Sequence, residues 1–156
     1  MDEMLKLAAN ARLLGELMAE GVNVALPVTA CDIDMLALVE SSADRPGSVS
    51  VPIQIVVLHS DGLARNLEAV PASGLLVALV WDVGESAPVR SFAFTSAELI
   101  LVKMIDLMSG ADVERAGADP EGAREAVLQN AMEPFAMSPG NWRKKLMAMV
   151  AESRAD

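Results

Sequence analysis

The sequence predicts a single-domain α/β protein whose strands lie in the first two thirds of the chain. Its 156 residues suit one domain, and 53% of them are hydrophobic, a fraction too high for intrinsic disorder. Segments with a helical period alternate with short segments rich in Val and Ile. The longest dense apolar run, residues 74–81, is far shorter than the roughly 20 residues that cross a bilayer, so we expect no membrane span.

The N-terminal third predicts one helix and three strands. Apolar residues recur at spacings of three and four over residues 2–20, which indicates an amphipathic helix, and Gly21 follows as a stop signal. Strands are predicted at 22–26, 33–40 and 49–58. Pro52 predicts an edge position or a bulge early in the third strand, because proline cannot donate to a ladder.

The rest of the chain predicts a loop, two strands and three helices. Thr95-Ser96-Ala97-Glu98 is typical of a capping box, so a helix should begin near Ser96, run to Met108 and stop at Gly110. Pro120 suits the first position of the next helix. The remaining predicted segments are a loop over 59–73, strands at 75–83 and 89–94, a loop over 110–119, a helix over 120–132 and a last helix that carries Trp142. We therefore expect one domain over residues 1–156 with a helical tail from about residue 120.

The charge balance favours protein partners over nucleic acid. Twelve Lys and Arg residues stand against 22 Asp and Glu, a net charge of −10, and a field of that sign repels a phosphate backbone. The N-terminus lacks the basic start and continuous apolar stretch of an export signal, so we expect a cytoplasmic protein. A single cysteine excludes an intramolecular disulfide and a Cys-based zinc site.

Isolated residues of interest are interpreted as structural. We expect Cys31 to be a small buried hydrophobe, His59 to have no catalytic role, and Trp81 and Trp142 to anchor the core. The 10 Met residues are predicted to fill gaps in the core, with a Met-lined binding face as the alternative. No glycine-rich phosphate loop and no nucleophile elbow is present.

Several short segments, spread over most of the chain, carry a resemblance to a known family. They are residues 14–17 (LGEL), 21–27 (GVNVALP), 34–37 (DMLA), 52–55 (PIQI), 79–83 (LVWDV) through 92–95 (FAFT), 134–139 (PFAMSP) and 142–146 (WRKKL). They are similar to the PD-(D/E)XK, or restriction-endonuclease-like, nuclease superfamily, and within it to small uncharacterised bacterial proteins. The resemblance implies a central mixed sheet of about five strands flanked by helices, with a helical C-terminal extension.

The resemblance also implies a remnant of a metal site. By position, Glu16 matches the helix carboxylate, Asp34 the strand aspartate and Gln54 the second strand ligand. In the superfamily such oxygens hold Mg²⁺, which activates water. Val56 stands where the superfamily has a lysine, and valine supplies neither a proton nor a positive charge. Lys6 or Arg12 on the first helix are the candidates for a displaced cation.

These departures lead us to expect a degenerate, non-catalytic protein. It would act as an interaction or regulatory module, would need no cofactor and would bind a protein partner or a second copy of itself. The alternative is a weak nuclease, a metal-dependent phosphodiesterase that uses Mg²⁺ or Mn²⁺ at Glu16, Asp34 and Gln54. Both interpretations assume that these three side chains meet in space.

Overall fold

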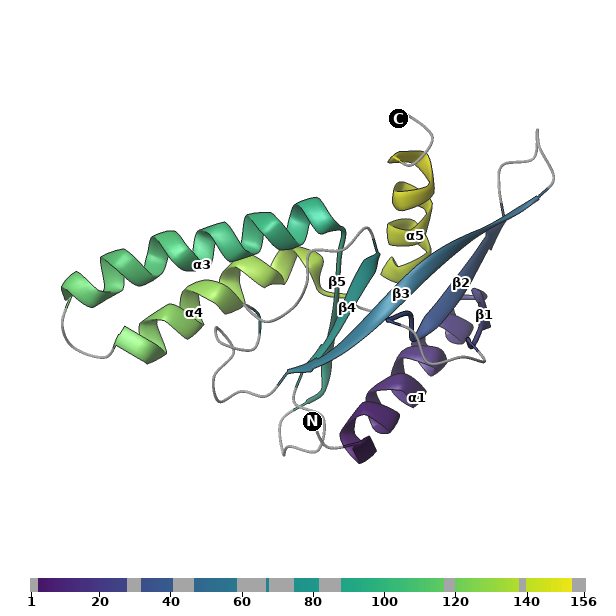
Figure 1. Cartoon of the computed structure of the whole chain (residues 1–156), viewed down its shortest axis with the longest axis horizontal. Coiled ribbons are helices and arrows are strands. Elements are labelled where there is room, and N and C mark those ends of the chain that lie inside the picture. The colour runs from purple at the N-terminus through teal and green to yellow at the C-terminus, as the bar shows by residue number, and fades with distance from the viewer. Residues whose placement is uncertain are drawn as a thin grey trace.

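A five-stranded sheet with helices on both faces forms the body of the molecule (Figure 1). The computed structural model describes residues 3–27, 32–40, 47–58, 67, 75–81, 88–116, 120–137 and 140–152. The elements are α1 (Glu3–Ala19), β1 (Asn23–Ala25), β2 (Met35–Glu40), β3 (Ser48–Leu58), β4 (Leu76–Trp81), β5 (Arg90–Phe94), α3 (Ser96–Ala116), α4 (Pro120–Met132), the 3₁₀ turn η1 (Glu133–Phe135) and α5 (Asn141–Glu152).

The sheet is mixed, and its strands follow chain order. The strands β1, β2 and β3 form an antiparallel meander, β4 runs parallel to β3, and β5 returns antiparallel to β4. The predicted α/β class with a mixed five-stranded sheet is therefore confirmed. The strand β4 is buried along its whole length, as its continuous apolar run predicts.

The strand β3 is central in the sheet, so the predicted edge position for the strand that carries Pro52 is wrong. The carbonyl of Ile53 and the amide of Ile55 both face Asp34 on the β2 side. Alternation along the strand therefore turns the Pro52 nitrogen toward β4. Because β4 pairs with β3 only from Ile53 onward, no ladder partner is lost at Pro52.

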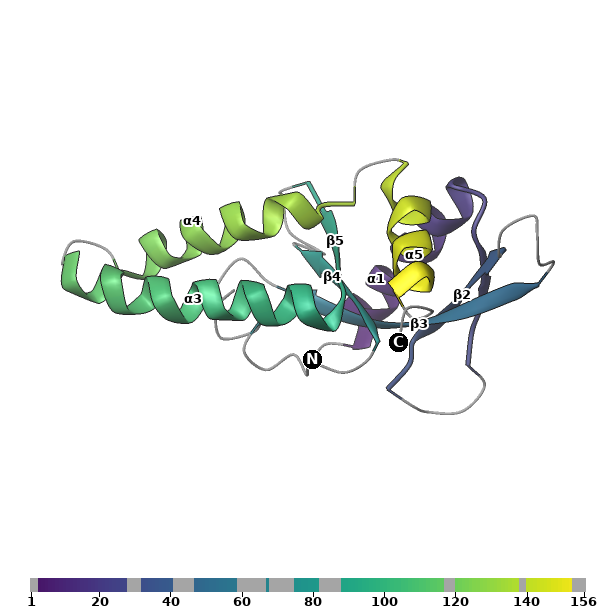
Figure 2. The same ribbon diagram turned by 90° about the horizontal axis from the view of Figure 1, so that it is seen from above.

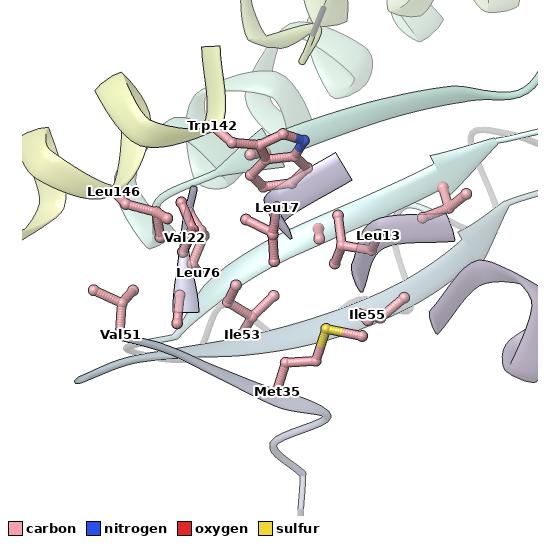
Figure 3. Packing of buried hydrophobic residues seen from close by; sticks show 14 of the residues in the cluster. Leu13, Leu17, Val22, Met35, Val51, Ile53, Ile55, Leu76, Trp142 and Leu146 are labelled. Carbon is pink, nitrogen blue, oxygen red and sulfur yellow. The ribbon is translucent and has the colours of Figure 1, made fainter. Parts of the chain in front are cut away.

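One face of the sheet is covered by α1 and α5 (Figure 3). Leu13 and Leu17 lie four residues apart on α1 and so share one side of that helix, where both are fully buried. Trp142 and Leu146 do the same on α5. These helices pack on the inward side chains of the strands, among them Met35, Val51, Ile53, Ile55 and Leu76.

The other face is covered by α3 and α4, which lie side by side as a hairpin. The two views show this hairpin projecting beyond the sheet (Figures 1 and 2). Only the ends nearest the sheet contribute to the described core of this face, through Leu99 and Val102 of α3 and Leu128 and Met132 of α4. The side chains that they meet on the sheet and beside it include Leu58, Leu67, Val77, Leu79, Trp81, Phe92 and Phe94.

The start of α3 is predicted correctly, but its end is not. The Glu98 carboxylate accepts from the Thr95 amide at 2.7 Å, and the Thr95 hydroxyl accepts from the Glu98 amide at 3.3 Å, which is the predicted capping box. The helix then continues through Gly110 to Ala116. A glycine inside a helix costs only about 1 kcal/mol, and packing against α4 outweighs that cost.

The chain changes faces between α4 and α5. After η1, Ala136 forms a bridge with Phe92, and the Met137 amide donates to the Ser91 carbonyl at 2.8 Å, so this short segment lies along the outer edge of β5. The helix α5 then packs on the face that α1 covers (Figure 2). The helical region from residue 120 is thus divided between the two faces.

Candidate functional site

Glu16 lies on α1 where that helix meets β5 and α5. Its carboxylate accepts a hydrogen bond from the Ser91 hydroxyl at 3.0 Å and another from the Trp142 indole nitrogen at 2.9 Å. The Arg12 guanidinium, one helical turn earlier, forms an ion pair with it at 2.9 Å. The same guanidinium donates to the Val89 carbonyl at 3.0 Å. Both carboxylate oxygens are therefore engaged in holding three elements together.

Asp34 lies immediately before β2 and joins the start of that strand to the backbone of β3. Its amide donates to the Ile53 carbonyl at 2.9 Å, and one carboxylate oxygen accepts from the Ile55 amide at 2.7 Å. Lys6 of α1 forms an ion pair with the other oxygen at 2.9 Å. The side chain of Asp34 is only 13% exposed. The structure thus places Lys6 and Arg12, the two candidates for a displaced cation, beside Asp34 and Glu16 respectively.

Gln54 and Val56 lie on the face of the sheet opposite α1. Ile53 and Ile55 face α1 and α5, and side chains alternate along a strand, so Gln54 faces the other way. Its register partner on β4 is Val77, which belongs to the core under α3 and α4. In the described part of the chain, the buried Gln54 Oε1 has no hydrogen-bond partner.

These positions do not form one metal site, so the assumption that Glu16, Asp34 and Gln54 meet in space is wrong. The Asp34 carboxylate contacts an amide of β3 and the Glu16 carboxylate contacts a side chain of β5, two strands away. At about 4.8 Å per strand, the two carboxylates are on the order of 10 Å apart across the sheet. One ion binds its oxygen ligands at about 2.0–2.6 Å, so it cannot reach both. Across the described residues, no group of three His, Cys, Asp or Glu side chains is placed to hold a metal. The residues therefore do not fit Mg²⁺ or Mn²⁺ as the superfamily binds it.

A cavity of about 600 Å³ lies beside Glu16, between α1 and the start of α5. Glu20 on its wall accepts hydrogen bonds from the amides of Gly140, Trp142 and Arg143 at 2.9–3.2 Å. This carboxylate, from the turn that follows α1, therefore caps the N-terminus of α5. With Glu16 and Glu20 both engaged, the acidic groups of the cavity serve the docking of α5 on α1. The full lining is Arg12, Glu16, Ala19, Glu20, Met137, Gly140, Trp142 and Arg143.

An exposed apolar surface on α3, which we call the α3 stripe, is the feature that the sequence interpretation missed. It consists of Ile100, Leu101, Met104, Leu107 and Met108, which are 47–69% exposed. Their spacing of three and four was the available signal, but the same spacing is also typical of a helix face that packs into a core. Met35 and Met132 fill the core, as predicted. The prediction that the methionines fill the core is wrong for the exposed ones, which are Met4, Met18, Met104, Met108 and Met147.

The other isolated residues divide into three groups. Trp81 and Trp142 are 4% and 1% exposed, which confirms them as core anchors. Cys31 and His59 lie outside the described residues. Of the three consecutive basic residues on α5, Arg143 and Lys144 are exposed, whereas Lys145 forms an ion pair with Glu98 and lies over the ring of Phe135.

Comparisons of the chain with protein-family models, with curated protein sequences and with solved structures give no significant match. In the described ranges, no helix combines the length and the apolar character that crossing a bilayer would require.

Proposed function

We propose that this chain is a non-catalytic α/β protein that acts as an interaction module. The observation that carries the proposal is the engagement of both Asp34 oxygens, one by the Lys6 ammonium and the other by the Ile55 amide. A metal ion at this carboxylate would have to displace the Lys6 ammonium or share an oxygen with the Ile55 amide. The mixed five-stranded sheet with helices on both faces fits the general α/β class, whereas the separation of Glu16, Asp34 and Gln54 does not fit the metal site that the resemblance implies.

The second carboxylate supports the same conclusion. Glu16 meets two hydrogen-bond donors and one guanidinium, and all three come from the chain itself. Val56 leaves the usual lysine position without a charge, and Gln54 faces away from both carboxylates. A nuclease needs these groups around one phosphate, whereas here the Glu16 and Asp34 carboxylates stabilise the packing of α1 on the sheet.

The α3 stripe supports an interaction role. Contiguous apolar patches of a few hundred Å² on a protein surface often mark binding sites. The net charge of −10 disfavours nucleic acid as the partner. The proposed partner is therefore another protein surface rather than a phosphate backbone.

Thermal unfolding in the presence of Mn²⁺ or Mg²⁺ tests the proposal. A single site would stabilise the fold by about 2.7 kcal/mol at a hundred-fold excess of metal over Kd. We expect no such shift, and no cleavage of duplex DNA, single-stranded DNA or RNA with either metal. Lys6→Met frees one Asp34 oxygen and is the sharpest variant. We expect it to remain insensitive to metal as well, because Glu16 is too far from Asp34 to complete a site.

Asp34→Asn is the matched control because it keeps an acceptor for the Ile55 amide while removing the charge. A metal-dependent stabilisation of the wild type or of Lys6→Met that disappears in Asp34→Asn would contradict the proposal. So would metal-dependent cleavage abolished by the same substitution. Either result would favour the weak nuclease instead.

A further inference from the structure

The α3 stripe covers one side of α3, and the other side of that helix packs on the core and on α4. Leu99, Val102 and Asp106 face inward, where Leu99 and Val102 join the core and Asp106 binds Arg124 of α4. The five residues of the stripe lie on the opposite side and are each about half exposed or more. The hairpin projects beyond the sheet, so its outer side is accessible to a flat partner (Figures 1 and 2).

The spacing of the stripe is symmetric about Met104. The other four members lie three and four residues before it and three and four residues after it. When two such helices pack antiparallel about a two-fold axis at Met104, Ile100 of one copy lies opposite Met108 of the other. Leu101 then lies opposite Leu107. A surface that maps onto itself in this way meets the requirement of an isologous contact, in which the same patch serves both subunits.

The exposed area of the stripe reaches the minimum expected of a specific dimer interface. Taking about 200 Å² for a fully exposed large aliphatic residue, the exposed fractions amount to roughly 570 Å² on each copy. Two copies would bury on the order of 1,000 Å² through these side chains alone, which is the threshold expected of a specific interface. Methionine tolerates imperfect apposition because its side chain is flexible.

Charge does not oppose this contact locally. The described acidic side chains of α3 are both engaged, Glu98 with Lys145 and Asp106 with Arg124. No carboxylate belongs to the stripe, so antiparallel packing brings no pair of like charges together there. The repulsion between two chains of net charge −10 acts over longer distances, which salt screens within about 8–10 Å at physiological ionic strength.

We propose that the α3 stripe is the interface of a homodimer in which two copies of α3 pack antiparallel about a two-fold axis at Met104. This inference rests on the proposed function, because it names the partner of the interaction module as a second copy of the chain. The contact is apolar and the chains repel at long range, so the dimer should become tighter as salt rises. A basic partner would show the opposite dependence.

Sedimentation velocity over a range of concentrations tests the dimer. We expect the wild type to have twice the chain mass, and Leu107→Glu or Met104→Glu to raise the Kd about a hundred-fold. Leu7→Glu is the matched control, because Leu7 on α1 is 61% exposed and Leu107 is 66% exposed. We expect Leu7→Glu to leave the dimer intact, and far-UV circular dichroism to show that each variant is folded.

Cysteine cross-linking tests the geometry without adding a charge. In a chain carrying Cys31→Ser, Met104→Cys should cross-link to itself, because it lies on the axis. Leu101→Cys should not cross-link alone but should do so when mixed with Leu107→Cys. A monomeric wild type, an equal loss of the dimer in Leu7→Glu, or self-cross-linking of Leu101→Cys would each overturn the inference. A monomer that also ignores Mn²⁺ would leave the proposed function standing with a different partner.

Discussion

Glu16 shows how a carboxylate in the position of a metal ligand can serve a structural purpose. It joins three elements through Ser91, Trp142 and Arg12. A hydrogen bond to a charged group is shorter and stronger than one between neutral groups, so this network fixes where α5 lies on α1. The loss of one donor leaves a partly buried charge with fewer hydrogen bonds, which lowers the stability of the fold.

Trp142→Phe tests the strength of this network. It removes the indole donor at 2.9 Å from the Glu16 carboxylate and part of a fully packed ring. We expect the free energy of unfolding to fall by about 2–4 kcal/mol, measured by urea denaturation. In a Glu16→Gln background the same substitution should cost at least about 1 kcal/mol less, because the charge that needed the donor is gone.

Trp81→Phe is the control for the loss of an indole. Trp81 is buried to a similar extent, but its indole nitrogen has no hydrogen-bond partner in the described part of the chain. It should therefore show no coupling with Glu16→Gln. Additive effects of Trp142→Phe and Glu16→Gln would mean that the hydrogen bond contributes little and that α5 is held by apolar packing alone.

The sequence identifies Glu16 and Asp34 as acids at the borders of apolar segments, but it cannot identify what they bind. The partners of Glu16 on β5 and α5 lie 75 and 126 residues away along the chain. Such contacts follow from how helices dock on the sheet, which no local pattern encodes. The same limit applies to Gln54: its strand is predicted correctly, but the face it occupies depends on which side α1 covers.

At the scale of elements, local sequence signals predict the end of a helix correctly at Gly21 and the start of a helix correctly at the Thr95 capping box. Gly21 ends α1 with a φ of 73°, a conformation that glycine adopts without strain, and the Thr95 capping box begins α3. The end of α3 is missed because Gly110 resembles the same kind of stop. What carries the helix past it is the long contact with α4, a tertiary effect.

A buried ion pair between Asp106 of α3 and Arg124 of α4 joins the two helices of that hairpin. Asp106 is 5% exposed, and the Arg124 guanidinium binds both of its carboxylate oxygens at 2.6 Å. Arg124→Met leaves a buried carboxylate without its counter-ion, and we expect the free energy of unfolding to fall by about 3–5 kcal/mol. The double variant Asp106→Leu/Arg124→Met should recover most of that loss, because the buried charge has been removed along with its partner.

The exposed pair of Arg90 and Glu133 provides the contrast. Its side chains are 40% and 62% exposed, so Glu133→Gln should change the free energy of unfolding by less than about 1 kcal/mol. Urea denaturation followed by far-UV circular dichroism measures all three variants. If the double variant is as unstable as Arg124→Met, then the stability lost in Arg124→Met comes from lost side-chain packing between α3 and α4. It does not come from an unpaired buried charge.

At the scale of the whole molecule, β4 links two cores that otherwise have separate helices. Its alternate side chains enter opposite clusters, with Leu76 and Val80 under α1 and α5 and Val77 and Leu79 under α3 and α4. A strand buried on both faces cannot separate from one cluster without disturbing the other. We therefore expect the sheet and both helical layers to unfold together, as most single domains of about this size do.

The two tryptophans allow a direct test of that coupling, because each cluster contains one. Trp142 belongs to the α1/α5 core and Trp81 to the α3/α4 core, and the chain has no other tryptophan. Trp81→Phe therefore leaves a fluorophore that reports on the first core, and Trp142→Phe leaves one for the second. Within each variant, we expect the fluorescence and far-UV circular dichroism midpoints in urea to coincide. Both are measured at one fixed protein concentration, because association would raise the midpoint.

A fluorescence midpoint in Trp142→Phe at clearly lower urea than its circular dichroism midpoint would show instead that the α3–α4 layer opens first. The burial of β4 would then be too weak to couple the two faces.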